Sequence, residues 1–223
     1  MKKILTGLML ITLFLSAKAY AEELIKLPEP EIKGGAPFNE VINTRRSIRD
    51  YQELPLSLKE ISQLAWSAQG ITEPNTGHRS APSAVASYPL KLYLVVKENG
   101  VSDLPAGVYL YQPESHSLKV IKKGNFYPEL LKAMPFFNKW VSQTNVTFIF
   151  TGSANYLTTI LGETGWSYVI LEAGMASENL LLSAVSMGLG ACPVGGFSDK
   201  KTSNLLGIEK GAKTLLLAPV GKK

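Results

Sequence analysis

The chain has 223 residues, of which 45% are hydrophobic and 18% are charged, and this balance excludes a disordered chain and suits one globular domain with a substantial core. Three of the charges in the formal net charge of +5 come from Lys2, Lys3 and Lys18. The remainder therefore carries +5 − 3 = +2, and a nucleic-acid surface is not implied.

The first 21 residues have the pattern of a secretory signal peptide. Lys2 and Lys3 precede an apolar run from Ile4 to Leu15 that is too short to span a bilayer. Ala19-Tyr20-Ala21 then fits the small-x-small cleavage rule. The sequence predicts cleavage before Glu22 and a periplasmic or secreted mature protein, with an uncleaved anchor as the alternative.

Cysteine and histidine are scarce. Cys192 is the single cysteine, so an intramolecular disulfide is excluded and the exported protein must be held by its core or by a partner subunit. His78 and His116 are the only histidines, too few for a metal site built mainly on imidazole. No metal site is predicted.

The first third of the chain leads into a helix. Residues 22–36 are rich in Pro and Gly and predict an extended lead-in rather than a packed element, and Pro37 suits the start of a short helix. Ser57 and Glu60 have the spacing of a capping box, which predicts a helix that a left-handed Gly70 closes. Residues 71–82 predict a long loop.

The remaining elements predict an α+β fold in which helices pack on an antiparallel-rich sheet, within one domain at residues 37–223. A long helix over 163–188 is apolar on most faces and is expected at the core. The β-branched and aromatic runs predict the strands. These are Leu90–Val96, Gly107–Tyr111 and Leu118–Ile121 as a meander, then Val146–Phe150 and Leu215–Val220 as buried strands.

Three segments are candidates for chemistry. Arg45, Arg46, Ser47 and Arg49 gather three guanidiniums and a hydroxyl just past the short helix. Guanidinium forks match phosphate oxygens, so this segment predicts an anion site. A solvated basic face is the alternative reading of the same residues.

The second candidate lies between the polar loop and the first long strand. Pro82, Ser83 and Ala84 are small enough for the backbone to approach a planar ligand, and Tyr88 could stack on that ligand or donate a proton. A plain loop-to-strand turn is the alternative.

The third candidate follows the long helix. Gly188, Gly190, Gly195 and Gly196 lie within nine residues, which indicates unusual backbone angles or close approach of a ligand. The segment follows a helix instead of opening one after a strand, so it is not a dinucleotide fingerprint. Cys192 within it is a candidate nucleophile, or a small buried side chain.

Together the segments resemble the nitroreductase superfamily and, within it, the SagB-type dehydrogenase branch. The resemblance covers residues 40–222 and rests on an ordered set of motifs. They are Arg-Arg-Ser-Ile-Arg at 45–49, Ala-Gln-Gly-Ile-Thr at 68–72, Ala-Pro-Ser-Ala at 81–84, Tyr-Pro-Leu-Lys-Leu-Tyr at 88–93, Gly-Val-Tyr-Leu-Tyr at 107–111, Leu-Glu-Ala-Gly at 171–174, Asn-Leu at 179–180 and Gly-Leu-Gly-Ala-Cys-Pro-Val-Gly-Gly-Phe at 188–197.

The resemblance implies an α+β sandwich that forms an obligate homodimer with FMN at the subunit interface. It also implies roles for single residues. The phosphate and ribityl chain would be held by Arg45, Arg46, Ser47 and Arg49, with Lys222 near the phosphate. The isoalloxazine would lie against Pro193, Val194, Gly195 and Gly196, and the partner subunit would place Pro82, Ser83 and Ala84 along the flavin. The substrate would touch Tyr88.

The chain also departs from the branch. Ser87 stands where azoline-forming members tend to carry Lys before the Tyr, and Met175 and Glu178 replace the usual His and Gln. Export further separates the protein from NAD(P)H. We therefore expect an oxidoreductase that takes electrons from its substrate, a small molecule or peptide, or that a protein partner reduces. An exported binding or scaffold protein without flavin turnover is the alternative.

Overall fold

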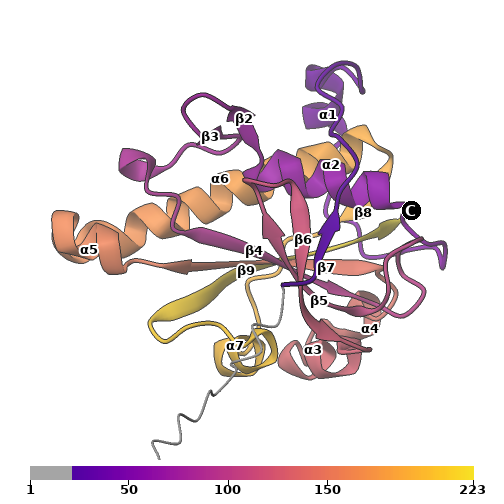
Figure 1. Cartoon of the computed structure of the whole chain (residues 1–223). Coiled ribbons are helices and arrows are strands. Elements are labelled where there is room, and N and C mark those ends of the chain that lie inside the picture. Colours follow the sequence, from indigo (N-terminus) through magenta and orange to yellow (C-terminus); the bar gives the residue numbers. More distant parts are fainter. Residues whose placement is uncertain (1–21) are drawn as a thin grey trace, which may run out of the picture.

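The computed structural model describes residues 22–223, so the predicted signal peptide lies outside the described residues. The described chain folds into one large sheet with helices on both faces (Figure 1). The predicted α+β class with helices on an antiparallel sheet is confirmed.

Seven strands form the large sheet in the order β1-β6-β5-β4-β7-β9-β8, and every neighbouring pair is antiparallel. Strands β2 and β3 form a separate small sheet. The predicted meander is β4, β5 and β6. The bounds are β1 Leu24–Lys26, β2 Ile71–Glu73, β3 His78–Arg79, β4 Leu90–Val96, β5 Gly107–Gln112, β6 Ser117–Lys123, β7 Val146–Ser153, β8 Leu189–Ala191 and β9 Ala212–Lys222.

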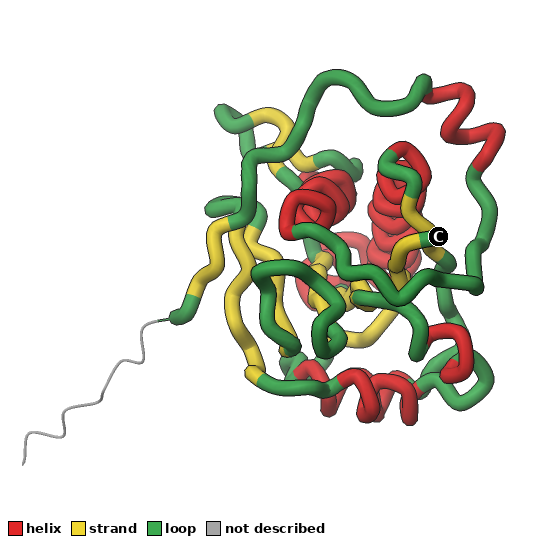
Figure 2. Tube along the Cα trace, turned by 90° about the vertical axis from the view of Figure 1, so that its right-hand side faces the viewer, coloured by secondary structure: helices red, strands yellow, loops and turns green. Residues whose placement is uncertain are grey.

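The helices form two layers, one on each face of the sheet. Helices α2 and α6 share a core with one face, and α3, α4 and α7 share a second core with the other. Figure 2 shows both layers from the side. The bounds are α1 Phe38–Thr44, α2 Leu58–Gln69, α3 Tyr127–Ala133, α4 Asn138–Val141, α5 Asn155–Leu161, α6 Gly165–Ser186 and α7 Asp199–Leu206, with 3-10 turns at Ala84–Ala86 and Gly162–Thr164.

Strand β7 lies inside the sheet between β4 and β9 and contributes to both cores. Phe148 and Phe150 belong to the core under α2 and α6, whereas Ile149 belongs to the opposite core, and all three are fully buried. Successive strand residues point to opposite faces, which explains this split. Truncating either phenylalanine to Ala should cost about 3–5 kcal/mol. The prediction of a buried strand here is confirmed.

The start of α2 agrees with the sequence, and its end does not. Glu60 N donates to Ser57 Oγ at 3.2 Å and Ser57 N donates to Glu60 Oε2 at 2.7 Å, which is the predicted capping box. Gly70 has φ −67° and ψ 149°, so the predicted left-handed cap is wrong. The chain runs directly from Gly70 into β2, and an extended backbone is needed there. The segment 71–82, which was predicted to be a loop, instead contains the β2–β3 hairpin.

The lead-in at 22–36 is partly packed, which corrects the prediction. Its residues 24–26 add the edge strand β1 beside β6. Next to it, Leu27 N donates to His116 O at 3.1 Å, and the His116 Nε2 to Pro28 O distance is 2.9 Å. The prolines and glycines of this segment gave no signal for the three-residue strand, which pairs with Ser117, Leu118 and Lys119 far along the chain.

Helix α6 crosses the molecule as the predicted central helix and ends before Gly188, which has φ +72°. One of its faces is exposed in the single chain, in contrast to the expected burial. The exposed side chains on that face are Tyr168 (43%), Leu171 (60%) and Met175 (42%), and Ile170 (59%) is exposed to one side of them. A row of large apolar side chains in water on one helix is a candidate surface for a partner.

Candidate functional site

The basic segment at 45–49 lies against the end of the sheet. Ile48 N donates to Ala191 O at 3.0 Å, and Gln52 N donates to Lys222 O at 2.9 Å. Gly190 allows this approach, because a Cβ there would lie 2.8 Å from Ile48 Cγ2. The segment is therefore fixed beside β8, immediately before the glycine-rich turn.

The guanidiniums of this segment differ in their contacts. Arg46, Ser47 and Arg49 are exposed. Arg46 Nη1 donates to Asn43 O at 3.1 Å and to Arg45 O at 2.7 Å. Arg45 is half-buried, and its Nε lies 3.5 Å from the carboxylate of Glu178 on α6. Of the four predicted phosphate ligands, Arg45 is thus already paired within the chain.

Lys222, predicted to lie near the phosphate, reaches this region through β9 but has an acidic partner. Its Nζ lies 2.6 Å from Glu60 Oε1. Burial alone would raise the pKa of Glu60, but the Lys222 ammonium and the Ser57 groups outweigh it and lower the pKa. Lys222 thus links the last strand to the cap of α2.

The glycine-rich turn presents an open surface next to the basic segment. Val194 exchanges backbone hydrogen bonds with Leu217 at 2.7 and 3.0 Å, and its own side chain is buried. The exposed residues are Pro193, Gly195 and Gly196. A Cβ on Gly195 would meet no atom within 4 Å. The thiol of Cys192 is buried and donates to Pro193 O at 3.7 Å, which favours the prediction of a small core side chain over a nucleophile.

Aromatic side chains around α4 join the two segments. Phe137 packs against Gly196, where an added Cβ would lie 2.8 Å from its Cε2. Trp140 lies 6.2 Å from the ring of Phe137, and the Arg49 guanidinium lies 5.9 Å from the centre of the Trp140 ring. The basic segment and the glycine turn therefore share one wall, formed by Phe137 and Trp140.

The segment at 82–88 is a rigid and strained unit. Val85, Ala86 and Tyr88 have φ values of 48°, 52° and 45°, which cost roughly 1–2 kcal/mol each. Ser83 holds the turn together, because its Oγ accepts from Tyr88 N at 2.8 Å and its carbonyl accepts from Ala86 N at 3.1 Å. Pro82 is exposed, and Ala84 is half-exposed.

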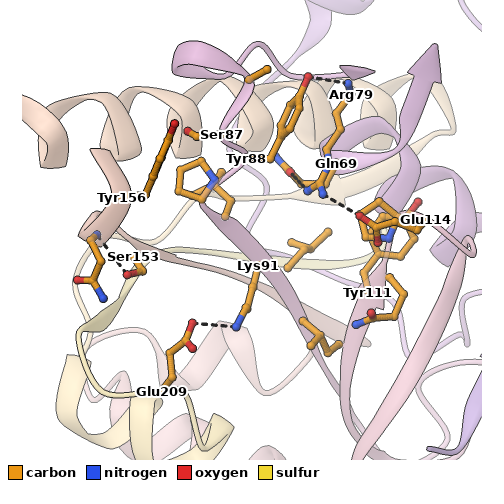
Figure 3. A pocket seen from close by; sticks show the side chains of 18 of the residues that line it. Gln69, Arg79, Ser87, Tyr88, Lys91, Tyr111, Glu114, Ser153, Tyr156 and Glu209 are labelled. Atoms are coloured by element: carbon orange, nitrogen blue, oxygen red, sulfur yellow. Dashed lines mark hydrogen bonds and ion pairs between the residues drawn. The ribbon is translucent and has the colours of Figure 1, made fainter. Parts of the chain in front are cut away.

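Tyr88 lines a cleft of about 890 Å³, and Arg79 fixes it there (Figure 3). Arg79 N donates to the Tyr88 hydroxyl oxygen at 3.1 Å, and the Arg79 guanidinium lies 4.7 Å from the centre of the Tyr88 ring. The guanidinium also donates to Gln69 Oε1 and to Glu114 Oε1, each at 3.1 Å. The phenol oxygen accepts from Arg79, so its own proton is free for a ligand.

Sequence reasoning missed Arg79, because a single arginine in a polar loop has no pattern. Its side chain is only 13% exposed, and three separate elements supply its partners. The contacts of Arg79 with Gln69, Tyr88 and Glu114 form only when the chain folds. The one feature of the sequence that could have pointed to Arg79 was its position just before Ser80, Ala81 and the candidate residue Pro82.

The candidate residues form two groups within one chain. The 84–88 segment lies toward the α5 end of α6, while α1, β8 and the C terminus lie toward its other end (Figure 1). Among residues 22–223, no hydrogen bond or ion pair joins the 82–88 segment to the 45–49 segment or to the 193–196 turn.

Glu172 on α6 is a further functional candidate that the sequence did not single out. Its side chain is 1% exposed, and neither carboxyl oxygen has a hydrogen-bond partner among the described residues. Burial raises the pKa of Glu172 to about 7, although the nearby Ser83 hydroxyl and the Arg79 guanidinium act to lower it. The buried carboxyl group of Glu172 thus lies in α6 near the segment that carries Arg79 and Ser83.

The fold and the arrangement of the two groups define a nitroreductase-like protein, and the comparisons agree. The nitroreductase family model matches residues 42–222. A nitroreductase homologue of Methanocaldococcus jannaschii is 36% identical over 200 residues, covering 89% of this chain and 96% of that protein. The chain belongs to the nitroreductase family.

Solved structures show the same fold. A nitroreductase homologue of Ralstonia eutropha has a TM-score of 0.74 and 24% identity, with 90% of each chain covered. A chain of the E. coli microcin synthetase complex, solved with truncated pro-MccB17 bound, has a TM-score of 0.70 and 18% identity. In that case 98% of this chain and 84% of the other are covered.

Replacing Glu172 with Gln should flatten the pH dependence of stability. The folded pKa of about 7 lies above the unfolded value of about 4.3, so the free energy of unfolding falls as the pH rises between these values and levels off above them. The total loss is roughly 3.7 kcal/mol at most. Urea unfolding at pH 5, 6, 7 and 8 measures it.

The exposed Glu163→Gln variant is the control and should keep the wild-type pH dependence. A Glu172→Gln protein with the same pH dependence as the wild type would show that Glu172 does not titrate in this range.

Proposed function

We propose that the protein is an exported FMN-dependent oxidoreductase of the SagB-type dehydrogenase branch, transferring two electrons between the flavin and a small-molecule or peptide substrate. The observation that carries the proposal is the hydrogen bond from Ile48 N to Ala191 O, which joins the basic segment to the glycine turn. Membership of the nitroreductase family supports an oxidoreductase.

The residues present suit a flavin with a terminal phosphate. The exposed side chains of Arg46, Ser47 and Arg49 are donors that a phosphate dianion requires. The open space beside Gly195 suits a flat ring that approaches the backbone. The flavin would supply the redox chemistry, while the protein binds and orients it.

The two separated groups of candidate residues support a homodimer. In this proposal Pro82, Ser83 and Ala84 of one subunit lie along the flavin held by the basic segment of the partner. The exposed apolar face of α6 would be covered by the second subunit. Tyr88 would then meet the substrate in the cleft, held by Arg79.

The electron donor follows from the predicted export. NAD(P)H is a cytoplasmic reductant, so an exported enzyme would take electrons from its substrate and pass them to oxygen or another acceptor. Reduction by a protein partner is the second route. Anaerobic mixing with NADH, NADPH and candidate substrates in a stopped-flow instrument separates these routes.

The alternative function is an exported binding or scaffold protein that retains the fold without flavin turnover. The absorbance of the purified protein distinguishes the enzyme from the scaffold. A purified mature protein with the flavin absorbance band supports the enzyme. A protein that stays colourless after incubation with FMN supports the scaffold.

Removing two guanidiniums should sharply weaken FMN binding. Charge-assisted hydrogen bonds contribute about 1.5–3 kcal/mol each, so Arg46→Ala with Arg49→Ala should lower FMN affinity by at least about 100-fold. Quenching of flavin fluorescence measures the affinity. The double variant Lys200→Ala with Lys210→Ala, at exposed positions of the α7 region, removes the same charge and should bind like the wild type. Equal FMN affinity in both double variants would refute the phosphate site.

Gly195→Ala should separate folding from flavin binding. The added Cβ meets no atom within 4 Å, so the melting temperature of the flavin-free protein should stay within about 2 °C of the wild type. FMN affinity should fall, because the methyl group occupies the space assigned to the ring. An unchanged affinity would place the ring elsewhere.

A charge on the exposed face of α6 should break the dimer. Leu171→Asp would bury a carboxylate in the interface, so sedimentation should show a monomer that also loses FMN. Ile32→Asp, at a 75% exposed position of the lead-in, should remain dimeric. A wild-type monomer that keeps stoichiometric FMN would contradict the shared site.

A further inference from the structure

Tyr51 lies two residues after the basic segment and is buried against the end of the sheet, with 8% of its surface exposed. Gly190 and Gly221 pair across β8 and β9, and the Tyr51 ring lies against both of them. A Cβ on Gly190 would lie 3.0 Å from Tyr51 Cε1, and a Cβ on Gly221 would lie 2.9 Å from Tyr51 Cδ1. The two paired glycines therefore form a seat for this ring that larger residues would fill.

The Tyr51 hydroxyl fixes the peptide that precedes Arg49. It donates to Ile48 O at 2.6 Å, while Ile48 N donates to Ala191 O at 3.0 Å. Burial raises the pKa of Tyr51 above its ordinary value, so the hydroxyl keeps the proton that it donates. Both backbone polar groups of Ile48 are thus held, and the direction in which the chain continues to Arg49 is fixed.

The Tyr51 ring also supports the side chain of Arg49. Tyr51 stacks on Trp140 with the ring centres 6.4 Å apart and the ring planes 23° apart. The Arg49 guanidinium lies over the Trp140 ring, 5.9 Å from its centre. A guanidinium that stacks through its flat face keeps its N–H edges free for an anion. Tyr51 therefore reaches Arg49 by two routes, through the backbone and through Trp140.

Arg49 is the guanidinium of the basic segment whose donors stay open. Arg45 is paired with Glu178, and Arg46 donates to two backbone carbonyls at the end of α1. Within the described part of the chain, Arg49 makes no hydrogen bond or ion pair, and its contact with Trp140 leaves its N–H groups available. The placement of this side chain therefore matters most for a bound phosphate.

We infer that Tyr51 is a positioning residue that gives the site its preference for a phosphorylated flavin over riboflavin, because it holds Arg49 through the Ile48 carbonyl and through Trp140. This inference rests on the proposed function. Riboflavin has the ring and ribityl chain of FMN but lacks the phosphate, so the ratio of the two affinities isolates the phosphate interaction. Tyr51 acts through Arg49 and needs no contact of its own with the flavin.

Binding of FMN and of riboflavin to Tyr51→Phe tests the inference. This variant keeps the ring on its glycine seat and removes only the hydroxyl. The ratio of FMN affinity to riboflavin affinity should fall about fivefold, the usual effect of one hydrogen bond, while riboflavin affinity stays that of the wild type. Quenching of flavin fluorescence measures both affinities. A ratio equal to that of the wild type would overturn the inference.

Tyr109→Phe is the matched control. Tyr109 is also buried, with 2% of its surface exposed, and its hydroxyl donates to Pro105 O at the same distance of 2.6 Å. The control should lower the melting temperature about as much as Tyr51→Phe does and should leave the ratio of affinities unchanged. An equal fall of the ratio in both variants would assign the effect to lost stability and would also overturn the inference.

A double variant tests whether Tyr51 acts through Arg49. Arg49→Ala removes a charge-assisted contact and should lower the ratio by at least about tenfold. Adding Tyr51→Phe to Arg49→Ala should lower it no further, because the side chain that Tyr51 positions is already missing. Losses that multiply in the double variant would contradict this route.

Hydrogen exchange in the flavin-free protein tests the positioning without any ligand. The amides of Ile48 and Gln52 should exchange faster in Tyr51→Phe than in the wild type, and Tyr109→Phe should leave them unchanged. Unaltered exchange in Tyr51→Phe would show that its hydroxyl does not hold the segment. A wild-type protein that binds neither flavin would refute the proposed function and the flavin preference with it, whereas flavin binding with an unchanged ratio in Tyr51→Phe would overturn the inference alone.

Discussion

The attachment of the basic segment to the end of the sheet is the constraint on which the site depends. Its two backbone hydrogen bonds, from Ile48 to Ala191 and from Gln52 to Lys222, fix a segment that has no regular structure of its own. The absence of a side chain at Gly190 permits the contact. Because β8 leads directly into the glycine turn, the same bonds set the distance between the guanidiniums and the open surface at Gly195. Phe137 and Trp140 then close one side of that space.

The second half of the site is organised around Arg79 rather than around a regular element. Arg79 connects α2, the β5–β6 turn and Tyr88, and Asn179 on α6 donates to the carbonyl of the neighbouring Ser80 at 3.2 Å. These contacts hold a turn with three left-handed residues that would otherwise relax. The strain is therefore stored next to Glu172 and Tyr88. The same small segment forms the environments of Glu172 and Tyr88, so a substitution at one residue is expected to affect the other.

The sequence predicted elements that local chemistry determines and missed those that distant contacts determine. The capping box at Ser57, the meander and the buried β7 follow from short patterns of side chains. Strand β1 escaped because its pairing with β6 depends on residues about ninety positions away. Helices α5 and α7 are short and were not predicted. In the site, the basic segment and the glycine turn were recognisable from composition. Arg79 and Glu172 were not, because burial and partners give them their properties.

The position of β9 has a consequence for the order in which the molecule is completed. This strand is the last element of the chain, yet it lies inside the sheet between β7 and β8 and also receives Gln52 and Glu60 at its final residues. The sheet can close, and the basic segment can gain its second anchor, only after residues 212–222 have been synthesised and have inserted between β7 and β8. Until then β7 has an unpaired edge, and the basic segment lacks the hydrogen bond from Gln52 to Lys222.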